Sequence, residues 1–151
     1  MKSKARAVVI GGGVVGVSTL YHLAAKGWDD SILLERKSLT SGSTWHAAGL
    51  LPLFNMSYSV GQIHKYSIRF YQELQDETGM DVGFRKVSNI RLASTQDRMD
   101  EYLQYKGVAD TIGVEVNVLS PQEIKDCWPL VSMENLIGAI QHPEDGYIQP
   151  A

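Results

Sequence analysis

The chain has 151 residues and a formal net charge of -3; 44% of its residues are hydrophobic and 21% are charged. This length allows one domain that buries about two-thirds of its unfolded surface, and the weak negative charge argues against a nucleic-acid partner. One cysteine excludes an internal disulfide framework, and no run approaches the roughly 20 apolar residues that cross a bilayer. We therefore expect a cytoplasmic protein, or one of the mitochondrial matrix if its source is eukaryotic, without a membrane partner.

The N-terminal residues predict a strand–helix–strand unit. The apolar run 7–10 is typical of a parallel strand covered on both faces. Three glycines interrupt it, and apolar residues then recur with helical spacing as far as Lys26, with Gly27 as the stop. A second buried-strand run, 31–34, ends on Glu35. This order predicts the start of a Rossmann-like α/β domain with a parallel sheet.

The residues beyond position 50 predict a mixture of helices and strands without repeats. The helix starts and stops are marked by capping residues, among them the sequence Ser-Pro-Gln-Glu at 120–123. The expected elements are a helix over about 60–78, a strand over 89–94, a helix between Thr95 and Gly113, a strand over 114–118, a short helix from Ser120 and a strand over 136–141.

The glycine turn carries the first chemical signal, G-x-G-x-x-G at Gly11, Gly13 and Gly16. The first glycine permits a tight turn, the second lets the backbone approach a pyrophosphate, and the third lets the helix pack closely on the strand. Glu35 follows Gly16 by about 20 residues, the spacing of a carboxylate that binds ribose hydroxyls. Arg36 raises the question of a 2′-phosphate, but Glu35 would repel one. The motif therefore predicts FAD or NAD rather than NADP.

The loop that follows, T-S-G-S-T-W-H-A-A-G-L at 40–50, is rich in small residues and hydroxyls. Small residues permit close approach to a cofactor, and backbone amides can bind a pyrophosphate and the edge of an isoalloxazine ring. Composition alone favours His46 as an ordinary loop histidine that hydrogen-bonds near the cofactor.

Several segments together resemble the amine-oxidising flavoproteins of the D-amino-acid oxidase superfamily, and most of all its dimethylglycine and sarcosine dehydrogenases. The resemblance covers nearly the whole chain. Its segments are VVIGGGVVG, ILLER, SGSTWHAAGL, QIHKYSIRFYQELQDETGMDVGF, NIRLAST, GVEVNVLSPQEI and HPEDGYIQP. It implies the first half of an FAD-binding domain at 1–55 and an excursion into an α+β substrate domain at 56–151. It also implies that the parent protein continues beyond residue 151.

The resemblance implies a function for the loop histidine. In that family the histidine of the WHAAG motif is joined covalently to the 8α-methyl carbon of FAD, and the matching position is His46. A hydride would pass from the N-methyl carbon of a secondary or tertiary amine to the flavin, leaving an iminium. The resemblance also implies an electron-transfer flavoprotein as a partner and tetrahydrofolate as a cofactor in a downstream domain of the parent protein. The family's catalytic base would lie beyond residue 151, so we assign none here.

We therefore expect FAD to contact one contiguous set of residues around the glycine turn and the loop. The predicted cofactor-binding residues are Gly11, Gly13, Val14, Val15, Gly16, Glu35, Arg36, Ser41, Gly42, Ser43, Thr44, Trp45, His46, Ala47, Ala48, Gly49 and Leu50. Three alternatives stay open: an amine or amino-acid oxidase of the superfamily with non-covalent FAD, a flavin-binding regulatory subunit without turnover, and an NAD-dependent dehydrogenase. The last has no evident use for the WHAAG loop.

The other polar and aromatic candidates have ordinary structural explanations. The four histidines are too scattered for a metal site. We expect His22 as a surface or packing residue, His64 as a hydrogen-bonded core or interface histidine and His142 in a structural role. Cys127 should be partly buried, and Glu144 and Asp145 solvated in a turn. Trp45 should either cover an aromatic ring or pack under its loop, and Tyr66, Phe70 and Tyr71 should lie in the core.

Overall fold

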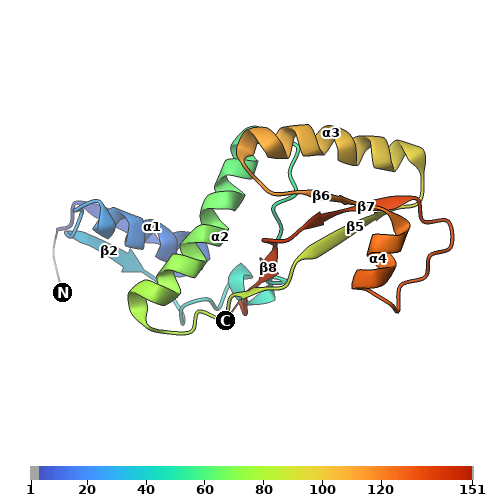
Figure 1. The fold of residues 1–151 in the computed structure, drawn as a ribbon. Helices are drawn as coiled ribbons and strands as arrows, with labels where there is room; N and C mark the ends of the chain where they lie inside the picture. Colours follow the sequence, from blue (N-terminus) through green and yellow to red (C-terminus); the bar gives the residue numbers. More distant parts are fainter. Residues whose placement is uncertain (1–3, 151) are drawn as a thin grey trace. The chain divides into compact units, whose positions relative to one another are not determined.

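The computed structural model describes residues 4–150, which form two compact units. The first unit runs to Ala48 and includes Pro150, and the second is Gly49–Gln149. In the first unit, strand β1 (Ala7–Ile10), helix α1 (Val14–Ala25) and strand β2 (Ser31–Leu34) follow the predicted order (Figure 1). The two strands pair in parallel with Ala7 opposite Ser31, which confirms the Rossmann-like start.

Backbone geometry explains why α1 ends where it does. Lys26 caps its C-terminus, and Gly27 has a φ of 78°, in the left-handed region that glycine adopts without strain. The Gly27 amide donates a 2.9 Å hydrogen bond to the carbonyl of Ala24. The predicted glycine stop is therefore confirmed.

The expectation that both strands are covered on both faces was wrong for this unit. Ile10 is 85% exposed, and Val8 and Leu34 are about half exposed. Within α1 no residue is buried. With only two strands and one helix in this unit, much of the surface of each strand is not covered. The hydrophobic core of the described residues lies in the second unit.

The second unit contains six strands, which form two small antiparallel sheets, and three helices. Strands β3, β8 and β4 form one sheet in that order, and β5, β7 and β6 form the other (Figure 1). The elements are β3 (Leu50–Leu51), α2 (Tyr58–Thr78), β4 (Arg85–Lys86), β5 (Asn89–Ala93), α3 (Gln96–Ile112), β6 (Asn117–Leu119), α4 (Pro121–Cys127), β7 (Gly138–His142) and β8 (Gly146–Tyr147).

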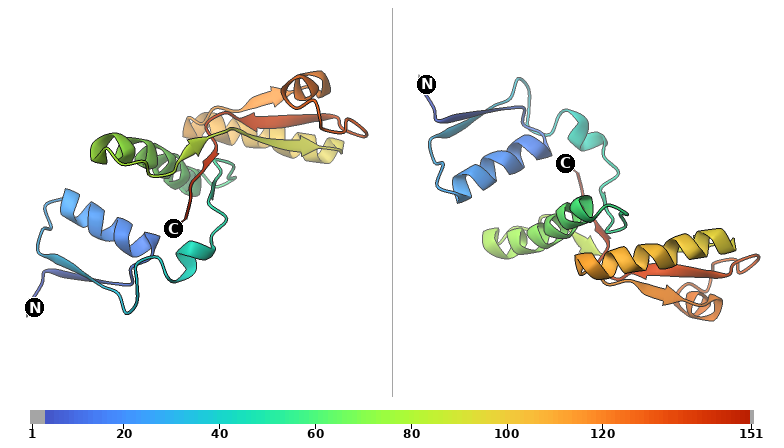
Figure 2. Two further views of the ribbon diagram at one scale, coloured as in Figure 1. Left: turned by 90° about the horizontal axis from the view of Figure 1, so that it is seen from below. Right: turned by 90° about the horizontal axis from the view of Figure 1, so that it is seen from above.

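The hydrophobic core lies between α3 and the β5-β7-β6 sheet. Helix α3 contributes the buried residues Tyr102, Tyr105, Ala109 and Ile112. It lies along one face of the sheet, whereas α4 covers the opposite face with the fully buried Ile124 (Figures 1 and 2). Every member of the core cluster belongs to the second unit.

The helix boundaries of this unit were predicted closely because they depend on local capping. The Thr95 hydroxyl accepts a hydrogen bond from the Arg98 amide at 3.3 Å at the start of α3. Ser120 and Glu123 form both hydrogen bonds of a capping box on α4. Gly79 and Gly113 end α2 and α3 with left-handed φ values of 67° and 76°.

Other expectations need correction. Only the last two residues of the predicted strand 114–118 belong to a strand, β6, which extends to Leu119. Val114 and Val116 precede this strand and pack into the core. The short strands β3, β4 and β8 were not predicted. In α2 the buried residues are Gly61 and Ile68.

Several side-chain environments were also predicted wrongly. Tyr66 is 46% exposed although it stacks on Phe70, and Cys127 is exposed. His64 is partly buried, but its Nδ1 has no partner among the described residues. Asp145 is not solvated: it is 2% exposed, whereas Glu144 pairs with Lys86 at 2.8 Å.

Candidate cofactor-binding site

The glycine turn between β1 and α1 is built for close packing. Gly11 has a φ of 105°, and its amide donates a 2.8 Å hydrogen bond to the carbonyl of Leu34 on β2. A Cβ on Gly16 would fall on the carbonyl oxygen of Gly11. The first and third glycines of the motif are therefore required by the backbone itself, and α1 lies close against the turn.

The carboxylate of Glu35 binds the backbone of this turn. Its Oε2 accepts a 2.6 Å hydrogen bond from the Gly12 amide, and its Oε1 accepts one of 2.8 Å from the Lys37 amide. The Gly12 amide, followed by the Lys37 amide, lowers the pKa of Glu35 below its usual value. The group is thus an anion held at the carboxyl end of β2, where a nucleotide ribose is bound in Rossmann-like folds.

Two hydrogen bonds connect the loop to the glycine turn. The Thr40 amide donates to the carbonyl of Gly12 at 2.9 Å, and the Val14 amide donates to the Thr44 hydroxyl at 2.9 Å. Val14 is the first residue of α1, whose first amides have no partner inside the helix. Thr40 has a φ of 64°, a strained value for a β-branched residue. The loop therefore has a defined place beside the helix N-terminus.

His46 lies in a short 3-10 helix, Ser43–His46, and its side chain is exposed. Its Nδ1 lies 3.1 Å from the carbonyl oxygen of Gly42, and because a carbonyl only accepts, Nδ1 carries the proton of the neutral ring. Nε2 then keeps its lone pair. The ring centroid of Trp45, a residue 56% exposed, lies 4.0 Å from that of His46. Trp45 therefore contacts the histidine ring rather than packing under the loop.

The comparison with protein families assigns the chain. The family model described as DAO, FAD dependent oxidoreductase, matches residues 6–151. The chain belongs to this family. Its relatives include rat mitochondrial dimethylglycine dehydrogenase, 42% identical over 149 residues, which are 99% of this chain and 17% of the relative. Human mitochondrial sarcosine dehydrogenase is 41% identical over 152 residues, covering all of this chain and 17% of the relative.

A solved structure of the same architecture supports the fold assignment. The crystal structure of L-proline dehydrogenase from P. horikoshii superposes with a TM-score of 0.90 at 25% identity. The superposition covers 99% of this chain and 39% of that one. By comparison, the chain spans about a sixth of the length of the dimethylglycine dehydrogenase and sarcosine dehydrogenase relatives.

The residues of the first unit fit the FAD of this family. A Cβ on Gly13 would approach the Thr44 hydroxyl to 3.0 Å, so a side chain there would close the space at the helix N-terminus. The N-terminus of α1 favours a pyrophosphate, and the anionic Glu35 can accept hydrogen bonds from ribose hydroxyls. Sequence reasoning missed Gly12, Lys37 and Thr40. Gly12 was recognisable in the sequence as the middle of three consecutive glycines. In the structure a Cβ on Gly12 would meet the side chain of Leu39 at 2.6 Å, so the position requires glycine unless that side chain moves.

The predicted cofactor residues divide between the two units. The predicted residues up to Ala48 belong to the first unit, and the last two, Gly49 and Leu50, belong to the second. Gly49 is buried with a φ of 72°, and its carbonyl accepts a 2.8 Å hydrogen bond from the Ile148 amide. Arg36, Ser41, Ser43, Ala47 and Ala48 are exposed. Of the predicted set, the structure brings together the glycine turn, Glu35 and the loop residues 41–46, which follow Thr40.

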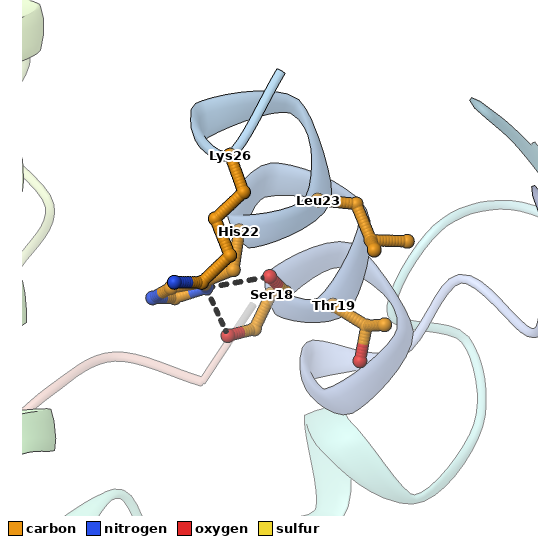
Figure 3. A pocket seen from close by; sticks show the side chains of 5 residues that line it. All are labelled: Ser18, Thr19, His22, Leu23 and Lys26. Atoms are coloured by element: carbon orange, nitrogen blue, oxygen red, sulfur yellow. Dashed lines mark hydrogen bonds between the residues drawn. The ribbon is translucent and has the colours of Figure 1, made fainter. Parts of the chain in front are cut away.

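A depression of about 360 Å³ on α1 is a separate feature, lined by Ser18, Thr19, His22, Leu23 and Lys26 (Figure 3). The His22 Nδ1 donates to the Ser18 carbonyl at 2.7 Å and also lies 3.3 Å from its hydroxyl. The lining of this depression includes neither the glycine turn nor His46. Among residues 4–150 there is no cluster of three potential metal ligands and no helix that could cross a membrane.

Proposed function

We propose that this chain is the cofactor-binding N-terminal part of a flavoprotein that oxidises a secondary or tertiary N-methyl amine of the dimethylglycine or sarcosine type. The observation that carries this proposal is the attachment of the histidine loop to the glycine turn through the Thr44–Val14 and Thr40–Gly12 hydrogen bonds. The relatives named dimethylglycine and sarcosine dehydrogenase support the substrate class. Bound flavin supplies the hydride acceptor for oxidation of the amine.

Each part of the predicted site has a role in this proposal. Gly11 and Gly16 shape the turn, Gly13 lets the backbone approach the pyrophosphate, and the N-terminus of α1 attracts it. Glu35 binds the adenosine ribose. Residues 41–50 lie along the flavin. His46 tethers it: since Nδ1 donates to Gly42, we assign Nε2 as the atom that bonds the 8α-carbon.

The tether can be tested on the full-length protein by acid precipitation. Wild-type protein should retain flavin fluorescence in the washed pellet, and His46→Ala should release all flavin to the supernatant. Trp45→Phe is the matched control, because it changes the neighbouring ring but keeps the nucleophilic nitrogen. Release of all flavin from the wild type would contradict covalent attachment through His46 and favour an oxidase with non-covalent FAD.

Amine-dependent reduction of a dye tests the reaction itself. Dimethylglycine or sarcosine should reduce the dye in the presence of the holoprotein, whereas NAD should have no effect. Tightly bound flavin without any amine-dependent reduction would instead identify a regulatory subunit. We place the parent protein in the mitochondrial matrix if its source is eukaryotic, and propose an electron-transfer flavoprotein as its oxidant and tetrahydrofolate as the ligand of a downstream domain.

A further inference from the structure

A group of buried polar side chains lies in the second unit and includes none of the predicted cofactor residues. His142 at the end of β7 is 0% exposed, and Asp145 in the following turn is 2% exposed. Arg91 on β5 is partly buried, with its guanidinium 4.2 Å from the centroid of the Phe54 ring. Its strand partner is Ile140 and that of Asn89 is His142, so Arg91 and His142 share one face of the sheet.

Hydrogen bonds define the protonation state of this cluster. The Tyr105 hydroxyl donates to the carbonyl of Leu53 at 3.2 Å, so it accepts from the Nε2 of His142, 3.0 Å away. His142 is therefore the neutral tautomer with its proton on Nε2, and its Nδ1 is an acceptor. On the other side of Leu53, the backbone amide donates to Oδ1 of Asp145 at 2.8 Å. Both polar groups of the Leu53 backbone are thus held by this cluster.

Three of its buried atoms have no partner among the residues that the structure describes: the Nδ1 of His142, the Oδ2 of Asp145 and the Nε of Arg91. An unpaired polar atom in such a place costs about 1–3 kcal/mol. No ion pair joins Arg91 to Asp145 within the described part of the chain. Both contact the same short segment of chain, since the Arg91 guanidinium lies over the Phe54 ring and Oδ1 of Asp145 accepts from the Leu53 amide. Burial raises the pKa of Asp145, against smaller lowering effects of the Leu53 amide and of the Arg91 charge. Burial and the same charge lower the pKa of His142.

The hydrogen-bonding chemistry of these three atoms determines which ligand they can bind. They offer one N–H donor, one imidazole lone pair and one carboxylate oxygen. An anion would be repelled by the carboxylate, and a metal cation by the guanidinium. A water molecule can donate two hydrogen bonds and accept one, and buried waters make about three hydrogen bonds to such otherwise unpaired groups.

We propose that one internal water molecule joins these side chains, donating to the Nδ1 of His142 and the Oδ2 of Asp145 and accepting from the Nε of Arg91. The water completes a network that also contains the Tyr105 hydroxyl and the backbone of Leu53. Its role is to bind the segment between β3 and α2 to the sheet through fully paired polar groups. This site is independent of the proposed flavin-dependent amine oxidation.

A crystal structure of the full protein at atomic resolution tests the site directly. We expect one ordered water within hydrogen-bonding distance of all three atoms. A direct contact between the guanidinium of Arg91 and the carboxylate of Asp145, or a site without water, would overturn the proposal.

A solution measurement gives an independent answer. Nitrogen chemical shifts of His142 should show a protonated Nε2 and an unprotonated Nδ1, and the Leu53 amide should show a dipolar cross-peak to a long-lived water. Protonation of Nδ1, or the absence of that water, would contradict the arrangement. Ser88→Ala is the control, because the Ser88 hydroxyl is also unpaired and its amide bonds the Asp145 carbonyl at 2.9 Å. The variant should keep the water signal; its loss would move the water to Ser88 and refute the three-atom site.

Discussion

The hydroxyl of Thr44 accepts a hydrogen bond from the backbone amide of Val14 at 2.9 Å, which connects the histidine loop to the first residue of α1. A hydroxyl that accepts from an amide can still donate its own proton. Thr44 can therefore bind the helix N-terminus and a phosphate oxygen at the same time.

We predict that Thr44→Val weakens both the helix start and cofactor retention. Loss of a hydroxyl at a helix N-terminus costs about 1 kcal/mol, which lowers the melting temperature of a chain of this size by roughly 2–4 °C. Thr44→Ser keeps the hydroxyl and should behave like the wild type in thermal unfolding and in flavin content. Equal losses in both variants would show that the methyl group, and not the hydrogen bond, matters.

Gly16→Ala is expected to destabilise the first unit. The added Cβ would overlap the Gly11 carbonyl oxygen, and such overpacking typically costs about 1–3 kcal/mol. Gly107→Ala is the matched control, because Gly107 is exposed on α3 and its Cβ would meet nothing within 4 Å. The control should gain about 0.5–1 kcal/mol of helix stability. Urea unfolding measures both, and a Gly16→Ala variant as stable as wild type would refute the close contact.

Asp145→Asn should change the pH dependence of stability. Burial raises the pKa of Asp145 from 3.8 to about 6, against the smaller opposing effects of the Leu53 amide and Arg91. Because the folded pKa is the higher one, the stabilising contribution is complete below about pH 4 and is lost as the pH rises through about 6. Asparagine keeps an oxygen for the Leu53 amide but carries no charge. The variant should therefore be more stable than wild type by about 1–3 kcal/mol near neutral pH, and about equal near pH 4.

The difference in unfolding free energy between the wild type and Asp145→Asn does not contain the titration of His142. Burial, assisted by Arg91, lowers the pKa of His142 to about 4, so its contribution is present above about pH 6.5 and lost as the pH falls through 4. Both proteins contain His142, so the difference between their unfolding free energies reports Asp145. A difference that does not vary with pH would contradict the raised pKa.

Tyr105→Phe should destabilise the second unit by about 1–3 kcal/mol, because the variant leaves the Nε2 of His142 and the carbonyl of Leu53 without their shared partner. Tyr58→Phe provides the control, since Tyr58 is 55% exposed and should change the unfolding free energy by less than about 0.5 kcal/mol. Equal effects of the two substitutions in urea unfolding would exclude an energetic role for the buried hydroxyl.

The sequence was most informative where structure depends on nearby residues. Helix ends were predicted closely at Thr95, Gly113 and Ser120 because capping is decided within one turn. The glycine turn and Glu35 were recognisable for the same reason: spacing along one strand–helix–strand unit fixes which atoms meet. The family could also be identified from sequence, since its motifs occur along nearly the whole chain.

Burial was decided by tertiary structure. Asp145 was expected in water, yet the fold places it beside Leu53, 92 positions away in sequence. Strands β1 and β2 were expected to be covered on both faces, yet the covering of a strand depends on distant segments. Short strands such as β3 and β8 have too few residues to show a periodic pattern.

The candidate site shows the same division. Sequence alone determined the residue types: glycines for close approach, an acid at the end of β2 and a histidine in a hydroxyl-rich loop. Tertiary structure decided the partners of Thr44 and Glu35, which bond Val14 and Gly12 across 30 and 23 positions, whereas the contact of His46 with Gly42 spans only four. Residue types follow from local chemistry, whereas partners depend on how the chain brings together atoms far apart in sequence.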